Sequence, residues 1–229
     1  MRVTIAGAGR GGLAVASHLQ NNGLNVIVIE RDPLVAKRVF EQFGIVALVG
    51  DATDPVLLGQ AEAARADAVL AMLHRDADNL AVVMLAKSLG ARRVMVRMRE
   101  PEYRSVYVAA GVNQILSETE VLVGALATAV EHETVRHSML VGNGSSIAFE
   151  VEIPEEAWII GKSVSEVAAD KAFPPSCVIA GLTRNGAVEA ARGNSTFTAN
   201  TQLLVISATK ELNAAISFFQ APASRKSHM

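Results

Sequence analysis

The sequence predicts an α/β fold in which a doubly wound parallel sheet is followed by a small α+β C-terminal domain. Up to about residue 135, short β-type runs alternate with Ala- and Leu-rich segments of helical character, as in repeated β-α units. Most of these helical segments stop at a glycine, the residue that most readily ends a helix. Beyond Met139 the pattern changes to short strands separated by Gly/Asn turns, which indicates a second domain.

Six strands and five helices are expected in the first part of the chain. Apolar runs predict the strands Arg2–Ala6, Val26–Glu30, Val46–Val49, Ala68–Met72, Arg93–Arg97 and Gln114–Leu116. The segments between them predict helices at about Gly11–Asn22, Pro33–Phe43, Pro55–Gln60, Asp78–Leu89 and Pro101–Ala110. Ser117-Glu118-Thr119-Glu120 then has the form of a capping box, which predicts a connecting helix that runs to about Arg136.

The second part of the chain predicts four strands and one helix. The strands are expected at Ile147–Ile153, Val178–Leu182, Val188–Ala190 and Leu203–Ser207, and the helix at about Val164–Lys171. Trp158, a lone aromatic residue in an apolar run, is expected to anchor the core of this domain. We therefore expect a first domain over residues 1–137, a second over residues 138–220 and a polar tail over residues 221–229, disordered from Ala223.

Composition narrows the class of protein. Half of the 229 residues are hydrophobic, which is enough for a substantial core, and no apolar run approaches the roughly 20 residues that span a bilayer. A net charge of −2 and 4% aromatic residues provide neither a basic surface nor a stacking platform, so nucleic acid is not an expected partner. The single cysteine, Cys177, excludes an internal disulfide and is expected to be buried and inert. We expect a cytoplasmic chain.

A glycine-rich segment follows the first strand. Gly7, Gly9 and Gly12 form the pattern G-x-G-x-x-G between a strand and a helix. In a Rossmann-like fold these glycines allow a tight turn, close approach of a pyrophosphate and close packing of helix on strand. Glu30 ends the second strand, where a carboxylate accepts hydrogen bonds from ribose hydroxyls and disfavours the 2′-phosphate of NADP. The spacing predicts a nucleotide site; the alternative is a tight turn with a solvated glutamate.

Further polar side chains follow the strands on which ligands of such sheets bind. Arg10, inside the glycine loop, either reaches phosphates bound to its own or a neighbouring subunit or is a solvated loop cation. Arg97 ends the fifth strand, where it either contacts a ligand or forms a structural ion pair. Asp51 either contacts the base or ribose or caps the helix that follows. His74 either lines the pocket or lies exposed in its loop. Asn79 is expected to bond to nearby backbone.

Several segments together resemble one family. Gly50-Asp51-Ala52-Thr53, Asp76-Ala77-Asp78-Asn79 and Val96-Arg97-Met98-Arg99-Glu100-Pro101-Glu102-Tyr103 follow the third, fourth and fifth strands in order, and Ile160–Val167 and Val178–Gly186 occur in the second half. Over nearly its whole length the chain resembles the regulator-of-potassium-conductance (RCK, Trk/Ktr-type) subunits. The resemblance implies a site for NAD(H) or ATP/ADP made of Gly7, Gly9, Arg10, Gly11, Gly12, Glu30, Arg31, Asp51, Ala52, Thr53, Leu73, His74 and Arg97.

The resemblance also implies a regulatory function and no catalysis. Such a subunit forms a homo-oligomer, from a dimer to an octameric ring, and gates a membrane-embedded potassium channel or transporter from the inner face of the cell membrane. The alternative is a small NAD-dependent oxidoreductase, but the second domain carries no recognisable acid-base set. His132 and His137 are five residues apart, unlike the i, i+4 pair of zinc proteases, so we expect surface residues of the connecting helix and no metal site.

Overall fold

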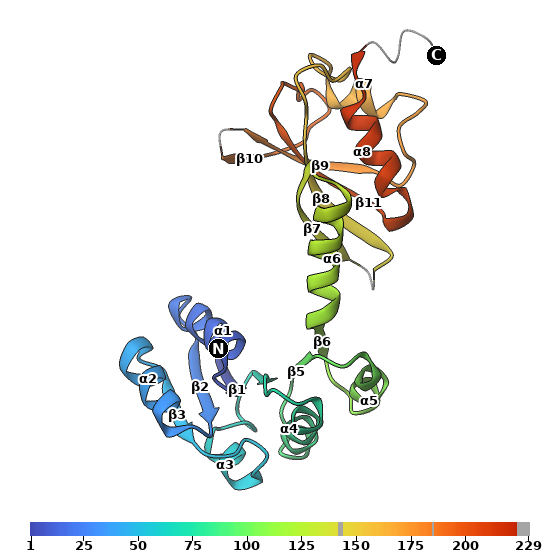
Figure 1. Cartoon of the computed structure of the whole chain (residues 1–229). Helices are drawn as coiled ribbons and strands as arrows, with labels where there is room; N and C mark the ends of the chain where they lie inside the picture. The colour runs from blue at the N-terminus through green and yellow to red at the C-terminus, as the bar shows by residue number, and fades with distance from the viewer. Residues whose placement is uncertain (142–143, 185, 224–229) are drawn as a thin grey trace. The chain divides into compact units, whose positions relative to one another are not determined.

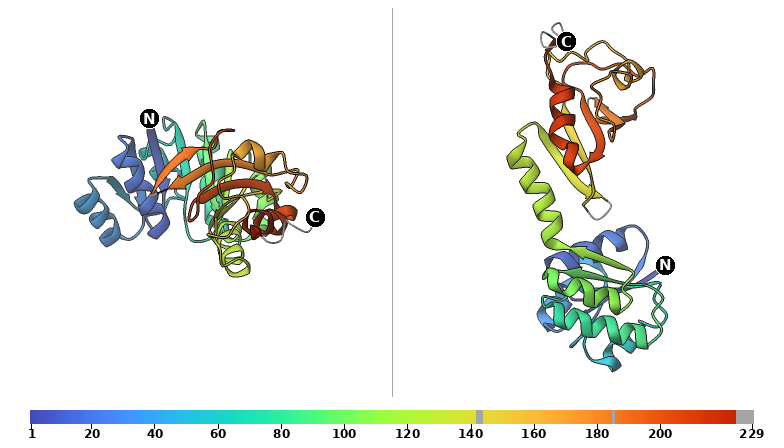
Figure 2. Two further views of the ribbon diagram at one scale, coloured as in Figure 1. Left: turned by 90° about the horizontal axis from the view of Figure 1, so that it is seen from above. Right: turned by 90° about the vertical axis from the view of Figure 1, so that its right-hand side faces the viewer.

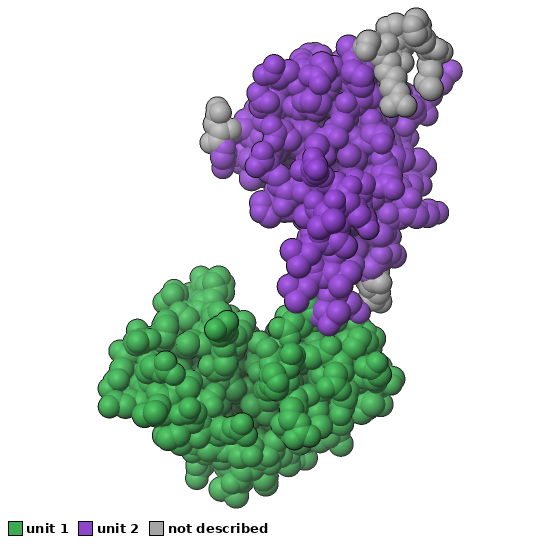
Figure 3. All heavy atoms as spheres, in the orientation of Figure 1, with its two compact units in different colours: residues 1–118 green, residues 119–229 purple. Residues whose placement is uncertain are grey.

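The computed structural model describes residues 1–141, 144–184 and 186–223 of the chain (Figure 1). The chain forms two compact units, residues 1–118 and residues 119–229, which Figure 3 colours separately. The first unit has two clusters of buried apolar side chains and the second has one. Each unit therefore has a core of its own.

The first unit is built on a six-stranded sheet in which every neighbouring pair is parallel. The strands are β1 (Arg2–Ala6), β2 (Asn25–Glu30), β3 (Val46–Val49), β4 (Ala68–Ala71), β5 (Val94–Met98) and β6 (Gln114–Ser117), in the order β3-β2-β1-β4-β5-β6. The order reverses between β1 and β4, which is the place where ligands bind to open α/β sheets. The predicted doubly wound sheet is confirmed, and each strand lies within one residue of its expected bounds.

The helices of the first unit are α1 (Arg10–Asn21), α2 (Pro33–Phe43), α3 (Pro55–Gln60), α4 (Asp76–Ser88), the short 3-10 helix η1 (Pro101–Tyr103) and α5 (Arg104–Ala109). Local sequence explains where two of them begin. The carboxylates of Asp32 and Asp54 accept backbone N–H groups at the first turns of α2 and α3, and a proline with fixed φ follows each. Gly44 ends α2 in a left-handed conformation, with φ of 66°.

Alternate strand residues face opposite sides of this sheet. Ile5 and Val28 pack with α1 and α2, whereas Ala6 and Ile29 pack with residues of α3 and α4. Helices therefore cover both faces, and a ligand has access to the sheet at the ends of its strands.

The second unit contains an antiparallel sheet in the order β10-β9-β11-β8-β7. Its strands are β7 (Val135–Val141), β8 (Ser146–Glu152), β9 (Val178–Arg184), β10 (Ala187–Ala190) and β11 (Gln202–Ala208). The helices are α6 (Glu118–Glu131, whose first residue belongs to the first unit), α7 (Val164–Ala168), the 3-10 helix η2 (Thr209–Glu211) and α8 (Leu212–Gln220). Figure 2 shows α8 beside β8 and β11. The predicted α+β character is confirmed.

Trp158 anchors the core of the second unit, as predicted. Its side chain is buried, its indole N–H donates to the Phe218 carbonyl oxygen at 2.8 Å, and its ring meets the Phe218 ring edge-on at 5.2 Å between centroids. Cys177 is buried, also as predicted. Burial and the nearby Glu211 carboxylate raise the pKa of its thiol to about 11.

Two predictions about this part of the chain are wrong. Helix α6 ends at Glu131 instead of about Arg136, and Val135–Val141 forms strand β7, so His132 and His137 do not lie on a helix. Val135–Val141 forms a strand because pairing with β8 supplies hydrogen-bond partners to its backbone and buries Val135. These tertiary contacts are not encoded in the local helical pattern. Helix α8, which was not predicted, buries Ile216 and Phe219 against the sheet.

The segment predicted as a polar tail begins with residues that join the second unit. The N–H of Trp158 donates to the carbonyl of Ala221, and the N–H of Ala223 donates to the carbonyl of Glu156. Residues 224–229 lie outside the described residues. In the described part of the chain, no helix has both the length and the apolar character needed to cross a bilayer.

Candidate nucleotide-binding site

A cavity of about 700 Å³ opens at the carboxyl ends of β1, β2, β4 and β5. It is lined by Gly7, Gly9, Arg10, Ile29, Glu30, Arg31, Gly50, Asp51, Ala52, Met72, Leu73, His74, Arg75, Asp78 and Arg97. The cavity therefore lies at the point where the strand order reverses, and its size is that of a ligand pocket.

The three motif glycines have three different roles in the backbone. Gly7 turns the chain with φ of +102°, a conformation that side chains disfavour. Gly9 caps α1, and a Cβ on it would meet no atom within 4 Å, so its surface is open to a ligand. A Cβ on Gly12 would lie 2.1 Å from the Gly7 carbonyl oxygen, so only glycine allows this helix to approach the turn. The start of α1 can thus meet an anion.

Glu30 is held rigidly at the end of β2. Its Oε2 accepts the N–H of Ala8 at 2.8 Å and its Oε1 accepts the N–H of Asp32 at 3.0 Å. Each carboxylate oxygen keeps further lone-pair capacity, so the two hydroxyls of a ribose can also be accepted. The first of these bonds joins the carboxylate to the glycine loop, which fixes the two expected parts of the site relative to each other.

Asp51 organises the turn after β3. Its Oδ1 accepts both the N–H of Thr53, at 2.9 Å, and the Thr53 hydroxyl, at 2.8 Å. The backbone bond first, then the hydroxyl and the charge of Arg31, lower the pKa of this carboxyl. The helix-capping alternative considered for Asp51 is wrong, because Asp54 caps α3. Thr53 supports the turn and does not line the cavity.

Asn79 ties the ends of β4 and β5 together from the first turn of α4. The side chain is fully buried, accepts the N–H of Leu73 at 2.7 Å and donates to the carbonyls of Leu73 and Arg97 at 3.1 and 3.2 Å. Its predicted role as a local backbone partner is confirmed. Arg97 in turn donates from Nη2 to the Leu73 carbonyl at 2.8 Å, which directs its guanidinium along the cavity wall.

A buried carboxylate braces the loop after β5. Asp76 is 1% exposed and accepts the N–H groups of Arg99 and Glu100 and the hydroxyl of Tyr107, the last at 2.8 Å. Burial, and then the bond to Asp76, raise the pKa of the Tyr107 hydroxyl far above its ordinary value, so it stays protonated as a donor. Arg99 Nη1 lies 3.0 Å from Nδ1 of His74, on the cavity wall.

The structure brings ten of the thirteen predicted residues to the cavity: Gly7, Gly9, Arg10, Glu30, Arg31, Asp51, Ala52, Leu73, His74 and Arg97. Gly11, Gly12 and Thr53 lie beside it as supports of the loop and turn. The sequence reasoning missed five lining residues, Ile29, Gly50, Met72, Arg75 and Asp78. Gly50 and Met72 directly follow β3 and β4, Ile29 lies inside β2, and Arg75 and Asp78 lie at the start of α4. Each therefore adjoins an element that the sequence analysis had already implicated.

The side chains that line the cavity suit an anionic ligand with hydroxyl groups. Among them are four arginines, Arg10, Arg31, Arg75 and Arg97, and three carboxylates, Glu30, Asp51 and Asp78. The pair Arg75–Asp78, 4.0 Å apart, lies on the exposed rim. Arginine binds phosphate by bidentate, charge-assisted hydrogen bonds, whereas fixed carboxylates accept from hydroxyls.

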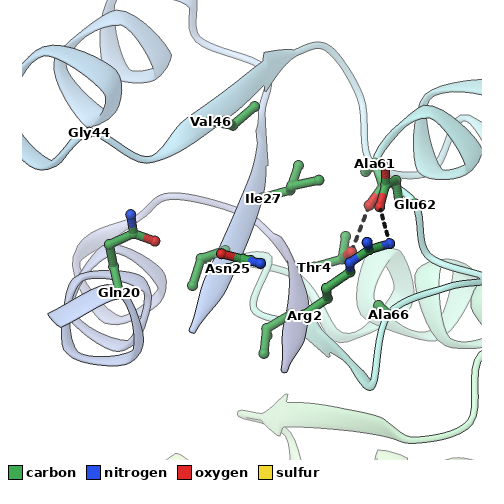
Figure 4. Close-up of a pocket in the computed structure, with 12 residues that line it drawn as sticks. Arg2, Thr4, Gln20, Asn25, Ile27, Gly44, Val46, Ala61, Glu62 and Ala66 are labelled. Atoms are coloured by element: carbon green, nitrogen blue, oxygen red, sulfur yellow. Dashed lines mark hydrogen bonds and ion pairs between the residues drawn. The ribbon is translucent and has the colours of Figure 1, made fainter. Parts of the chain in front are cut away.

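A smaller cavity of about 330 Å³ lies at the opposite, amino ends of the strands (Figure 4). Arg2 and Glu62 form an ion pair at its edge, 3.2 Å apart, and Thr4 donates to the Ala61 carbonyl. Because these polar groups pair with one another and no glycine loop adjoins it, this cavity lacks the anion-binding features of the larger one.

A Rossmann-like domain with a glycine-rich turn at its switch point, followed by a small α+β domain, places the chain among two-domain α/β proteins. The chain belongs to the TrkA-N domain family, whose model matches residues 3–118, and residues 148–220 match the TrkA-C domain. The resemblance to RCK-type regulatory subunits is thereby confirmed.

Relatives and solved structures agree with this assignment. The chain is similar to the Trk system potassium uptake protein TrkA homolog of Archaeoglobus fulgidus, with 30% identity over 99% of this chain and 51% of that protein. It is similar to the Trk system potassium uptake protein TrkA of Vibrio alginolyticus, with 27% identity over 80% of this chain and 40% of that protein. The chain thus spans about half the length of these relatives, or less. The structure of the "GsuK channel bound to NAD" has the same fold, with a TM-score of 0.70 and 19% identity over 96% of this chain and 40% of that one.

Proposed function

We propose that this chain is a nucleotide-binding regulatory subunit of a potassium channel or transporter. The observation that carries the proposal is the pairing of both domain types, in the order found in a family of potassium uptake proteins, with a complete glycine loop. In this role the chain lies at the cytoplasmic face of the membrane and reaches the membrane only through its partner. Ligand binding changes the conformation of an assembly, and that change gates the partner.

The ligand proposed for the larger cavity is NAD(H) or ATP/ADP, with the thirteen residues named from the sequence in or beside it. The open surface at Gly9 supports a diphosphate at the start of α1. The fixed carboxylate of Glu30 supports a ribose with free hydroxyls. These features are shared by all adenine nucleotides. The similar GsuK channel is bound to NAD, which is one of these ligands.

Helix α6 supports a homo-oligomer. Five apolar side chains along its 14 residues are more than half exposed: Val121, Leu122, Val123, Leu126 and Val130. Apolar residues so close together on a surface helix mark an interaction site. We propose that α6 packs against a second copy of this chain. Leu126→Glu should then dissociate the assembly, whereas the exposed Met84→Glu on α4 should not, as measured by light scattering.

The alternative function, a small NAD-dependent oxidoreductase, would need an acid-base residue beside the nicotinamide. His74 is the one histidine among the described residues that line the larger cavity, and it contacts Arg99. Arg99 Nη1 also lies 3.1 Å from Nε2 of the same ring, so the guanidinium stands against both nitrogens that a general base would use to reach a substrate. We therefore propose that the chain does not catalyse hydride transfer.

Calorimetric titration with NAD⁺, NADH, ATP and ADP, run beside light scattering, tests the proposal. We expect binding that changes the size or shape of the assembly and produces no turnover. Gly9→Ala should abolish binding and keep the fold, since the added methyl occupies the space of the diphosphate; Gly59→Ala, also without a neighbour within 4 Å, is the matched control. Reduction of NAD⁺ would favour the oxidoreductase, and no binding of any nucleotide would contradict both functions.

A further inference from the structure

Glu118 does not line the cavity but lies beside Arg97, which does. Its Oε1 is 3.9 Å from Nη1 of Arg97, and its Oε2 is 3.3 Å from Nε of Arg99. It is also the first residue of α6, the helix that continues into the second unit. This single carboxylate therefore connects the cavity wall to the start of α6.

A phosphate group could readily replace Glu118 as the partner of Arg97. The side chain of Arg97 is 17% exposed, and its Nε is buried with no hydrogen-bond partner among the described residues. Glu118 is its one acidic partner within 4.0 Å in the described part of the chain, at a distance too long for a hydrogen bond. A phosphate oxygen at about 2.7–2.9 Å would satisfy this guanidinium far more completely.

We propose that Glu118 is a specificity-determining residue that competes with bound phosphate for Arg97. The proposal rests on nucleotide binding in the larger cavity. Glu118 partly neutralises the positive charge of Arg97 and repels a nearby anion. It therefore lowers the affinity for a ligand in proportion to the phosphate charge that the ligand brings to Arg97. The coupling between ligand binding and the Arg97–Glu118 ion pair is reciprocal. A highly charged ligand therefore also weakens the ion pair between Arg97 and Glu118, the first residue of α6.

The test compares the affinities of AMP, ADP and ATP for the full chain and for Glu118→Gln, by calorimetry in EDTA. Loss of the carboxylate charge should raise the affinity for ATP by roughly three- to tenfold, that for ADP by less and that for AMP least. The gain should shrink at high salt, because the added ions screen the interaction. Glu131→Gln, an exposed glutamate at the other end of α6, is the control and should leave all three affinities unchanged.

Unchanged or weaker ATP binding in Glu118→Gln would overturn the inference, as would an equal gain for AMP and ATP. A wild-type chain that binds NAD(H) but none of the three would also overturn the inference, whereas a chain that binds no nucleotide at all would instead reject the proposed function. The affinity ratio of ATP to AMP separates this role from a structural one, because a general loosening of the fold would shift all ligands together.

Hydrogen exchange provides a second measurement. ATP should raise the exchange rate of amides in the first turn of α6 in the wild-type chain, where phosphate displaces Glu118. In Glu118→Gln, the increase should be smaller. An identical response in the two proteins would contradict the proposed competition even if the affinities differed.

Discussion

The side-chain amide of Asn79 closes a hydrogen-bonded ring with the backbone of Leu73, accepting its N–H at 2.7 Å and donating to its carbonyl at 3.1 Å. Both atoms of the amide are needed, because the donor also reaches the carbonyl of Arg97. The wall of the larger cavity between β4 and β5 therefore depends on one buried side chain that does not itself line the cavity.

Asn79→Asp should destabilise the first unit by about 2–4 kcal/mol at pH 7, because a buried carboxylate would face two carbonyl oxygens. Burial raises the pKa of the introduced carboxyl above its value in the unfolded chain, so the loss should diminish as the pH falls towards about 4. Urea denaturation at both pH values measures this. Asn113→Asp is the control: its Oδ1 accepts from Val94 and Lys87, and both bonds survive the change. Equal effects at the two sites would contradict the prediction.

Gly12→Ala should destabilise the first unit by at least about 2 kcal/mol, although alanine favours helices. The reason is the 2.1 Å separation between the added Cβ and the Gly7 carbonyl oxygen, which only a movement of the backbone can relieve. Gly59→Ala, in α3 with open space around it, should be stabilised by about 0.5–1 kcal/mol instead. Thermal unfolding measures the stability of both variants. If Gly12→Ala left the stability unchanged, the turn at Gly7 would adjust freely and the prediction would be wrong.

Glu30→Gln should lower the affinity for adenine nucleotides by roughly 10- to 100-fold, since charge-assisted hydrogen bonds to the ribose become neutral ones. The amide N–H₂ would also face one of the backbone donors that the carboxylate now accepts. Glu41→Gln, in an exposed pair with Lys37, is the control. NADP⁺ should bind the wild-type chain at least about tenfold more weakly than NAD⁺. Unchanged affinity in Glu30→Gln would refute the ribose assignment.

Cys177 should resist alkylation by iodoacetamide at about pH 8 in the native protein and react rapidly in urea, because its pKa is about 11 in the folded chain. A raised pKa favours the folded state while the thiol is protonated. Its stabilisation is therefore complete below the ordinary value of 9.0 and is lost as the pH rises from there to about 11. The difference in unfolding free energy between wild type and Cys177→Ala should fall over that range; a constant difference would contradict the assignment.

Sequence reasoning was most successful where short-range patterns decide the structure. The glycine spacing, the proline and aspartate that start α2, and the strand ending in Glu30 are local features, and each lies where it was expected. It was wrong at β7, where residues with a helical pattern pair with β8, and it missed α8, whose apolar face has meaning only against the sheet.

The doubly wound sheet, the α+β domain and most of the cavity wall could be read from the amino-acid order alone, because strand ends in a parallel sheet meet at one edge whatever the loops between them do. Which charges face one another was settled only by the folded arrangement. Asp76 braces the backbone of Arg99, and Glu118 lies beside Arg97, in each case about twenty residues away along the chain. Such contacts depend on strand register and on the direction in which a helix leaves the sheet, and no local pattern encodes either.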